Sequence, residues 1–178
     1  MKMDINKALG VLKHGMSTEI WGLEFYQQAL TRTVDETGRK VFASLVEEEE
    51  SHLKILRGEY AALSGSKAGW ITREEALELA ASVDPTTIFP EPQAAEALIP
   101  ADASDLDVLA IAMDFENKGY TFYQSEAALA DSPEAKRMWA QLAKAENNHY
   151  TFLQKSHEYL ANNGVWFFDE NELPFFEG

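Results

Sequence analysis

The sequence predicts an all-α protein, a four-helix bundle built from two helical hairpins that a long crossover connection joins. Apolar residues return every three or four positions through four long segments, which is the period of an amphipathic helix. The first sixty residues are repeated later in the chain, and prolines gather between the two copies. At 178 residues with 46% hydrophobic residues, the chain is expected to form a single domain over residues 1–178.

The internal repeat aligns without a gap at a constant offset of 97 residues, the distance from Glu19 to Glu116. The matches include Leu12, Met16, Glu19, Gly22, Phe25 and Tyr26 with Leu109, Met113, Glu116, Gly119, Phe122 and Tyr123, and Glu49 and His52 with Glu146 and His149. The repeat predicts hairpin one over residues 4–63 and hairpin two over residues 103–161.

Each hairpin is expected to contain two antiparallel helices with a short turn between them. The predicted helices span residues near 4–32, 38–63, 103–130 and 133–161. Gly38 is expected in the turn of the first hairpin. Ser132 followed by Pro133 has the pattern of an N-cap and a first helical residue, so the fourth helix is expected to begin there.

Residues 64–102 form the predicted crossover, in which two glycines and four prolines prevent any long helix. Thr72 and Glu75 have the spacing of a capping box, which predicts a short helix near 73–82. A connection of this length is needed if the second and third bundle helices run parallel, because the chain must return along a bundle about 40 Å long. The aromatic tail, residues 164–178, is expected to pack over the bundle or onto a second subunit.

Composition excludes several kinds of chemistry. The chain has no cysteine, so disulfides, zinc ribbons, iron–sulfur clusters and thiol nucleophiles are excluded. A net charge of −15 argues against nucleic acid as a partner. The N-terminus lacks the pattern of a secretion signal, and no apolar run reaches the roughly 20 residues that span a bilayer, so no membrane association and a cytoplasmic location are expected.

Six polar residues fall on the apolar stripes that should face the bundle interior at similar depth. They are Glu19, Glu49, His52, Glu116, Glu146 and His149. Buried carboxylates without partners are costly, and two divalent cations would balance the charge of four glutamates and two neutral histidines. Oxygen and nitrogen ligands without sulfur suit iron, manganese or zinc. One Glu-x-x-His alone is weak evidence, but two in one repeat register, each paired with a core glutamate, strongly favour a two-metal site.

At these positions the sequence resembles the rubrerythrin-like branch of the ferritin-like superfamily, through the stretches EIWGLEFY, EEEESH, ENKGYTFY and AENNH. The resemblance implies a ferritin-like bundle with two iron ions, replaceable by manganese or zinc, that reduces hydrogen peroxide or dioxygen. It also implies a homodimer. Rubrerythrins typically carry a rubredoxin domain with four cysteines, so here a separate protein would donate the electrons. They also have an additional glutamate where this chain has Gly119, so a shift of iron between ligands is not expected.

The residues around the six leave some alternatives open. Tyr26 and Tyr123 lie two turns beyond Glu19 and Glu116, where each hydroxyl could hold a ligand carboxylate or simply pack in the core. Gly22 and Gly119 would allow either close helix packing or access of the oxidant to the metals. His14 and His157 are not expected to be ligands, and Glu47, Glu48 and Glu50 are expected to be solvated.

The sequence leaves the function open between two classes of protein, with a third reading beside them. The leading hypothesis is a di-iron oxidoreductase, and the main alternative is a non-catalytic protein that binds or handles iron, such as a ferroxidase or storage protein. The third reading is a bundle with a purely structural metal, such as zinc.

Overall fold

The computed structural model describes residues 5–83 and 99–167, in which the regular secondary structure is α-helical and no strand occurs. The helices are α1 (Ile5–Arg32), α2 (Glu36–Ser64), α3 (Arg73–Ala81), α5 (Asp105–Leu129) and α6 (Pro133–Asn163). The predicted all-α bundle is confirmed, and the predicted helix limits lie within two residues of the observed ones. Within the described residues no helix has the length and apolar character needed to cross a membrane.

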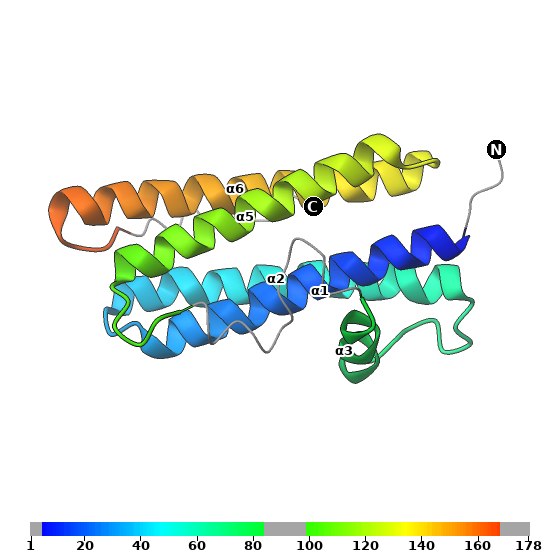
Figure 1. Ribbon diagram of the computed structural model, residues 1–178, viewed down its shortest axis with the longest axis horizontal. Helices are drawn as coiled ribbons and strands as arrows, with labels where there is room; N and C mark the ends of the chain where they lie inside the picture. Colours follow the sequence, from blue (N-terminus) through cyan, green and yellow to red (C-terminus); the bar gives the residue numbers. More distant parts are fainter. Residues whose placement is uncertain (1–4, 84–98, 168–178) are drawn as a thin grey trace.

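The bundle consists of two antiparallel hairpins lying side by side, α1 with α2 and α5 with α6 (Figure 1). Helices α2 and α5 run in the same direction, so the chain has to return along the bundle between them, as the length of the crossover predicts (Figure 1). The short helix α3 packs against α1. Residues 84–98 of the predicted crossover lie outside the described residues.

Most helix ends follow the capping pattern of the sequence. Thr72 and Glu75 form the predicted capping box at the start of α3. Ser132 caps α6, with Pro133 as the first helical residue. Ser104 forms a further capping box with Asp107 at the start of α5.

The prediction that Gly38 lies in the turn that connects the two helices of the first hairpin is wrong. Asp35 is the N-cap of α2, and its Oδ1 accepts the backbone N–H groups of Thr37 at 2.8 Å and Gly38 at 3.1 Å. Gly38 therefore lies inside the first turn of α2, where it is buried. A Cβ atom there would meet the side chains of Thr33 and Trp166, so the glycine serves close packing and not a turn.

The first part of the predicted C-terminal tail packs over the bundle. The indole of Trp166 is 8% exposed and lies edge-on to Phe42, with ring centroids 5.7 Å apart. Its Nε1–H donates to Asp105 Oδ2 at 2.8 Å, which ties the tail to the first residue of α5. Residues 168–178 of the tail lie outside the described residues.

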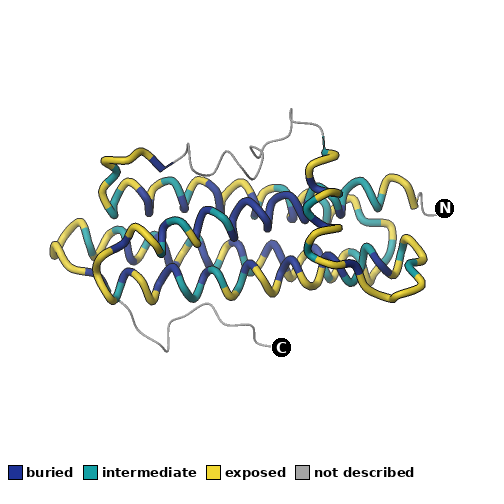
Figure 2. Tube along the Cα trace, turned by 90° about the horizontal axis from the view of Figure 1, so that it is seen from below, coloured by how far each residue is buried: buried dark blue, intermediate teal, exposed yellow. Residues whose placement is uncertain are grey.

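Buried residues line the inner sides of the four long helices (Figure 2). They form two apolar clusters, one with Leu45 of α2 and the other with Leu53. Glu49 and His52 lie between these two residues along α2, and both side chains are fully buried. The polar site thus occupies the middle of the bundle, with apolar layers on both sides.

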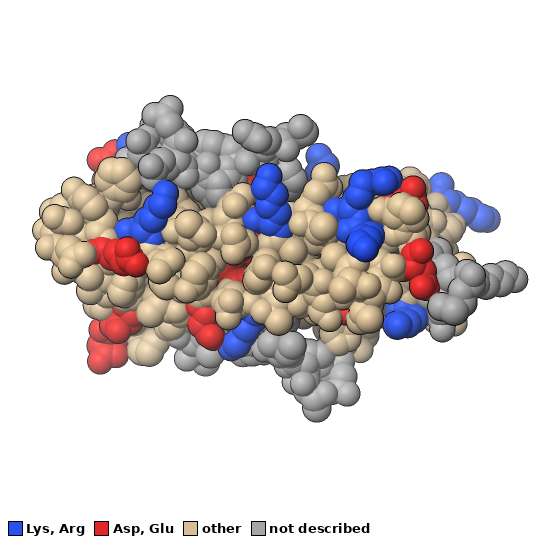
Figure 3. All heavy atoms as spheres, turned by 90° about the horizontal axis from the view of Figure 1, so that it is seen from above, with Lys and Arg blue, Asp and Glu red and all other residues tan. Residues whose placement is uncertain are grey.

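On the outer face formed by α5 and α6, acidic and basic side chains are interspersed (Figure 3). The described part of that face therefore carries no continuous patch of either sign. Elsewhere among the described charges, an ion pair lies along α5, where Lys118 Nζ is 2.7 Å from Asp114 Oδ2.

Candidate metal centre

The structure brings all six predicted site residues together, each at most 1% exposed. Helices α1 and α5 contribute one glutamate each, while α2 and α6 contribute a glutamate and a histidine one turn apart. The six are Glu19, Glu49, His52, Glu116, Glu146 and His149.

The six residues form two overlapping groups of four, and in each group the candidate ligand atoms lie within 4.8 Å of one another. The first group is Glu19, Glu49, His52 and Glu146, and the second is Glu49, Glu116, Glu146 and His149. Glu49 and Glu146 belong to both groups. Each group also has one glutamate and one histidine of its own, so two ions bound there would share the two common carboxylates.

The distances follow the sequence repeat, because the two histidines have equivalent surroundings. His52 Nδ1 lies 3.2 Å from Glu19 Oε2 and 3.4 Å from Glu146 Oε1. His149 Nδ1 lies 3.3 Å from Glu116 Oε2 and 3.5 Å from Glu49 Oε1. The two imidazole rings are roughly parallel, with centroids 5.4 Å apart.

Two buried tyrosines connect the hairpins at the site. The hydroxyl of Tyr26 on α1 donates to Glu116 Oε1 on α5, and the hydroxyl of Tyr123 on α5 donates to Glu19 Oε1 on α1. Each tyrosine therefore holds a carboxylate of the opposite hairpin, which leaves the second oxygen of that carboxylate directed toward the histidines. The sequence predicted that these hydroxyls could hold carboxylates but did not indicate that the bonds cross between hairpins.

The electrostatics of the site are dominated by burial and by the proximity of like charges. Burial raises the pKa of Glu49 and of Glu146 well above the ordinary value, and neighbouring carboxylates raise both further. Burial also raises the pKa of both tyrosines, with Glu116 adding to this effect at Tyr26 and Glu19 at Tyr123. Without cations, the site is therefore one in which carboxyl groups retain protons.

The histidine pKa values move upward, although burial by itself would lower them. Glu19, together with Glu49 and Glu48, raises the pKa of His52 to about 9. Glu116 and Glu49 raise the pKa of His149. Burial would raise the pKa of Glu116, but His149 and the Tyr26 hydroxyl lower it. The site attracts positive charge strongly, whether the charge is carried by protons or by metal ions.

The donor set fits two divalent cations. Both oxygens of Glu49 and Glu146, Glu116 Oε2 and both nitrogens of His149 are buried without a hydrogen-bond partner among the described residues. Buried polar atoms are rarely left unpartnered, and metal ligation satisfies such atoms directly. Four carboxylates and two neutral imidazoles carry four negative charges, which two divalent ions balance.

The two glycines face the shared carboxylates. A Cβ atom on Gly22 would lie 2.8 Å from Glu49 Oε2 and 2.8 Å from Phe115 Cε1, and one on Gly119 would lie 3.0 Å from Glu146 Oε2. The space beside both glycines is thus filled by the glutamate side chains. This arrangement favours the close-packing alternative over an access route for an oxidant.

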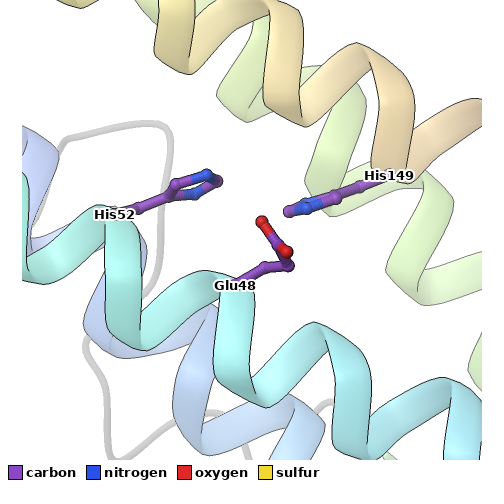
Figure 4. Close-up of side chains that lie close together, drawn as sticks. All are labelled: Glu48, His52 and His149. Atoms are coloured by element: carbon purple, nitrogen blue, oxygen red, sulfur yellow. The ribbon is translucent and has the colours of Figure 1, made fainter. Parts of the chain in front are cut away.

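Glu48 differs from the prediction that it is solvated. It is only partly exposed, its Oε2 is buried, and its carboxylate points between the rings of His52 and His149 (Figure 4). One oxygen of Glu48 and one nitrogen of each ring lie within 4.8 Å of one another. The spacing of Glu48 and His52, four residues apart on one helix face, could have indicated this contact.

The other flanking residues agree with the prediction. Glu47 and Glu50 are exposed. That His14 and His157 are not ligands stays a prediction; in the described parts of the chain, neither belongs to a group of three or more residues that could hold a metal ion.

The fold and the site together define a ferritin-like helical bundle with a carboxylate and histidine cluster that could hold metal. The chain belongs to the family described as Ferritin-like domain, whose family model matches residues 7–158. A hypothetical protein from Pyrococcus furiosus has a similar solved structure, with 22% sequence identity and a TM-score of 0.64 over 90% of this chain and 98% of that one. At this identity the likeness shows the fold alone. A search of curated proteins gives no significant match.

Proposed function

We propose that this protein is a rubrerythrin-like di-iron oxidoreductase that reduces hydrogen peroxide or dioxygen with electrons from a separate donor protein. The site described above would hold two iron ions through Glu19, Glu49, His52, Glu116, Glu146 and His149. Manganese or zinc could replace the iron. From the resemblance of the sequence to rubrerythrins, we also expect the protein to act as a homodimer.

The observation that carries the proposal is the sharing of Glu49 and Glu146 by two otherwise separate ligand groups. Carboxylates that bridge two positions favour a pair of ions over a single one. A glutamate from each of two helices, with Glu-x-x-His from each of the others, is the ligand set of ferritin-like di-iron and di-manganese proteins. The unpartnered oxygens of the shared carboxylates support the same conclusion.

The donor set favours a redox metal over a structural zinc ion. Structural zinc sites are usually closed and tetrahedral and rely on cysteine and histidine. Here each group offers three carboxylates and one histidine, and each carboxylate can bind through one oxygen or two. Such a site can leave a coordination position for a small oxidant.

The residues of the chain would hold, orient and shield the site. The hydroxyls of Tyr26 and Tyr123 hold the carboxylates of Glu116 and Glu19 in one orientation. Without these hydrogen bonds, each carboxylate would be free to rotate. Apolar layers on both sides exclude water. Iron bound in the site would bind and polarise the oxidant and supply electrons to it. The sequence has no cysteine to bind a rubredoxin-type iron centre, and we therefore assign the supply of electrons to a separate donor protein.

The alternative is an iron-handling protein in which oxidation accompanies storage or transfer. In the described residues, every group of residues suited to a metal includes at least one histidine of this centre. Because the candidate metal-binding groups among the described residues are confined to this one centre, the structure favours catalytic turnover at a fixed pair of ions over storage of many iron ions.

The test is metal analysis of the purified protein followed by titration of the reduced form with hydrogen peroxide under anaerobic conditions. We expect two irons per chain, stoichiometric oxidation by peroxide and steady-state consumption when a reductant is supplied. Glu146→Gln should lose the pair, whereas the control Glu134→Gln, at an exposed position on the same helix, should not. Many irons per chain without turnover would support the iron-handling alternative, and tightly bound zinc without redox activity would support a structural metal.

A further inference from the structure

The two ring nitrogens of each site histidine, Nδ1 on the inner side and Nε2 on the outer side, have different surroundings. Both Nδ1 atoms face carboxylates of the metal centre, at 3.2 to 3.5 Å. A neutral imidazole has one lone pair, so a ring that binds a metal through Nδ1 carries its proton on Nε2. A metal-binding histidine almost always donates that second N–H to a carboxylate, a carbonyl or water.

His149 Nε2 is buried and has no partner among the described residues. Glu48 supplies the nearby acceptor, since its carboxylate points between the two rings (Figure 4) and its buried Oε2 has no hydrogen-bond partner in the described chain. The separation, within 4.8 Å of a nitrogen of each ring, is one that a small side-chain rotation or a single water molecule closes.

We propose that Glu48 is a positioning residue that accepts the Nε2–H groups of His52 and His149, directly or through one water molecule, and so presents both Nδ1 lone pairs to the metal ions. This inference rests on the proposed two-metal site. Glu48 does not bind the ions itself and acts through the orientation and tautomer of the two imidazoles.

In the second hairpin, the internal repeat offers no counterpart to the Glu48 carboxylate. The position equivalent to Glu48 in the second hairpin is Ala145, which has no hydrogen-bonding side chain. One carboxylate from α2 therefore faces both rings, and one of its oxygens lies within 4.8 Å of a nitrogen of each ring. This breaks the symmetry of a site whose six proposed ligands are otherwise repeated.

A third cation between Glu48 and the two rings is a competing use of the same atoms. Such an ion would need the Nε2 lone pairs, but each neutral ring has only one lone pair and the inner carboxylates favour its use at Nδ1. An outer ion and a filled inner pair would therefore compete for the same two imidazoles.

The test compares the wild type with Glu48→Leu and Glu48→Gln, and uses Glu47→Leu, at an exposed neighbouring position, as the matched control. Zinc ions serve as a diamagnetic probe. Chelator competition gives affinity and stoichiometry, and ¹⁵N NMR of the histidines reports the tautomer and the exchange of the Nε2–H protons. These NMR signals would not respond to a merely structural role.

We expect the wild type and Glu47→Leu to bind two zinc ions with slowly exchanging Nε2–H protons. Glu48→Leu should bind zinc about 10- to 100-fold more weakly, with fast exchange at both rings. Glu48→Gln, which keeps one acceptor oxygen, should lie between them.

Unchanged affinity and unchanged N–H signals in Glu48→Leu would overturn the inference while leaving the two-metal site intact. A third zinc ion in the wild type that disappears in Glu48→Leu would also overturn it, because Glu48 would then be a ligand. A wild-type protein that binds no pair of ions would overturn the proposed function, and this inference with it.

Discussion

Tyr26 and Tyr123 each hold a glutamate of the opposite hairpin, so their hydroxyls act on the proposed ligands without being ligands themselves. Replacing either tyrosine with phenylalanine keeps the buried ring and removes only the donor. We expect Tyr26→Phe and Tyr123→Phe each to weaken zinc or iron binding about 10-fold or more, because Glu116 or Glu19 loses its fixed orientation. Chelator competition measures the change.

Tyr120→Phe is the matched control for these substitutions. It lies on the same helix as Tyr123, but its hydroxyl accepts a hydrogen bond from Gln124, and among the described residues no hydrogen bond joins it to a glutamate of the site. Wild-type affinity in Tyr26→Phe, or an equal loss in Tyr120→Phe, would contradict the orienting role of the tyrosines.

At Gly22 the site packs closely against the apolar core. Alanine in a helix is usually more stable than glycine by about 1 kcal/mol. At Gly22, however, its Cβ would press on Glu49 Oε2 and on the ring of Phe115, which itself lies against Trp21. We expect Gly22→Ala to lower the free energy of unfolding by about 1 to 3 kcal/mol and to weaken metal binding.

Denaturant unfolding of the metal-free protein, with chelator competition, checks this expectation. Gly10→Ala is the control, because a Cβ there meets nothing within 4 Å and the substitution should stabilise the protein by up to about 1 kcal/mol. If Gly22→Ala were as stabilising as Gly10→Ala, the close packing of Glu49 against α1 would not constrain the site.

At the scale of the helices, the sequence was sufficient to predict which residues are buried wherever the apolar stripe of a single helix determines their burial. Glu49 and His52 lie on the same apolar stripe as Leu45 and Leu56, and burial of the stripe brings the polar pair inside. The repeat then places the equivalent pair of α6 at the same depth. For this reason the helices and the convergence of the six residues could be predicted together.

Contacts between helices were harder to predict, because they depend on how far each helix is rotated against its neighbours. Glu48 is at the edge of the buried stripe of α2, and only the position of α6 brings His149 beside it. Gly38 was misplaced for a similar reason. Asp35 extends α2 toward its N-terminus, and the partner that fills the space beside Gly38 is Trp166, far away in the sequence.

Trp166 joins elements that the repeat does not relate to one another, since it packs on Phe42 of α2 and donates to Asp105 of α5. We expect Trp166→Ala to lower the free energy of unfolding by about 3 to 5 kcal/mol, as loss of a large buried aromatic side chain usually does. Trp166→Phe, which keeps a ring but loses the donor, should cost less. Denaturant unfolding checks both variants, and equal losses would show that the hydrogen bond dominates.

At the scale of the whole molecule, the metal-free folded protein binds more protons than the unfolded chain does. Its free energy of unfolding should therefore fall as pH rises. The pKa of His52 is about 9 in the folded protein against 6.5 for the unperturbed group. Its stabilising contribution is therefore complete below about pH 6.5 and lost as pH rises through about 9. Glu49 and Glu146, with pKa values raised above 4.5, act in the same direction, because ionisation above pH 4.5 favours the unfolded chain.

Bound metal should reverse this dependence. Ions replace the protons, so their affinity rises with pH, and the stabilisation they give rises with it. Urea unfolding at pH 5.5, 7 and 8.5 should show a falling free energy of unfolding with a chelator present, and a growing difference between the chelated protein and protein saturated with manganese. Glu49→Gln combined with Glu146→Gln removes two of the titrating groups, so the pH dependence of the metal-free protein should become flatter. A metal-free protein equally stable at all three pH values would mean that the buried charges are compensated by something other than protons or cations.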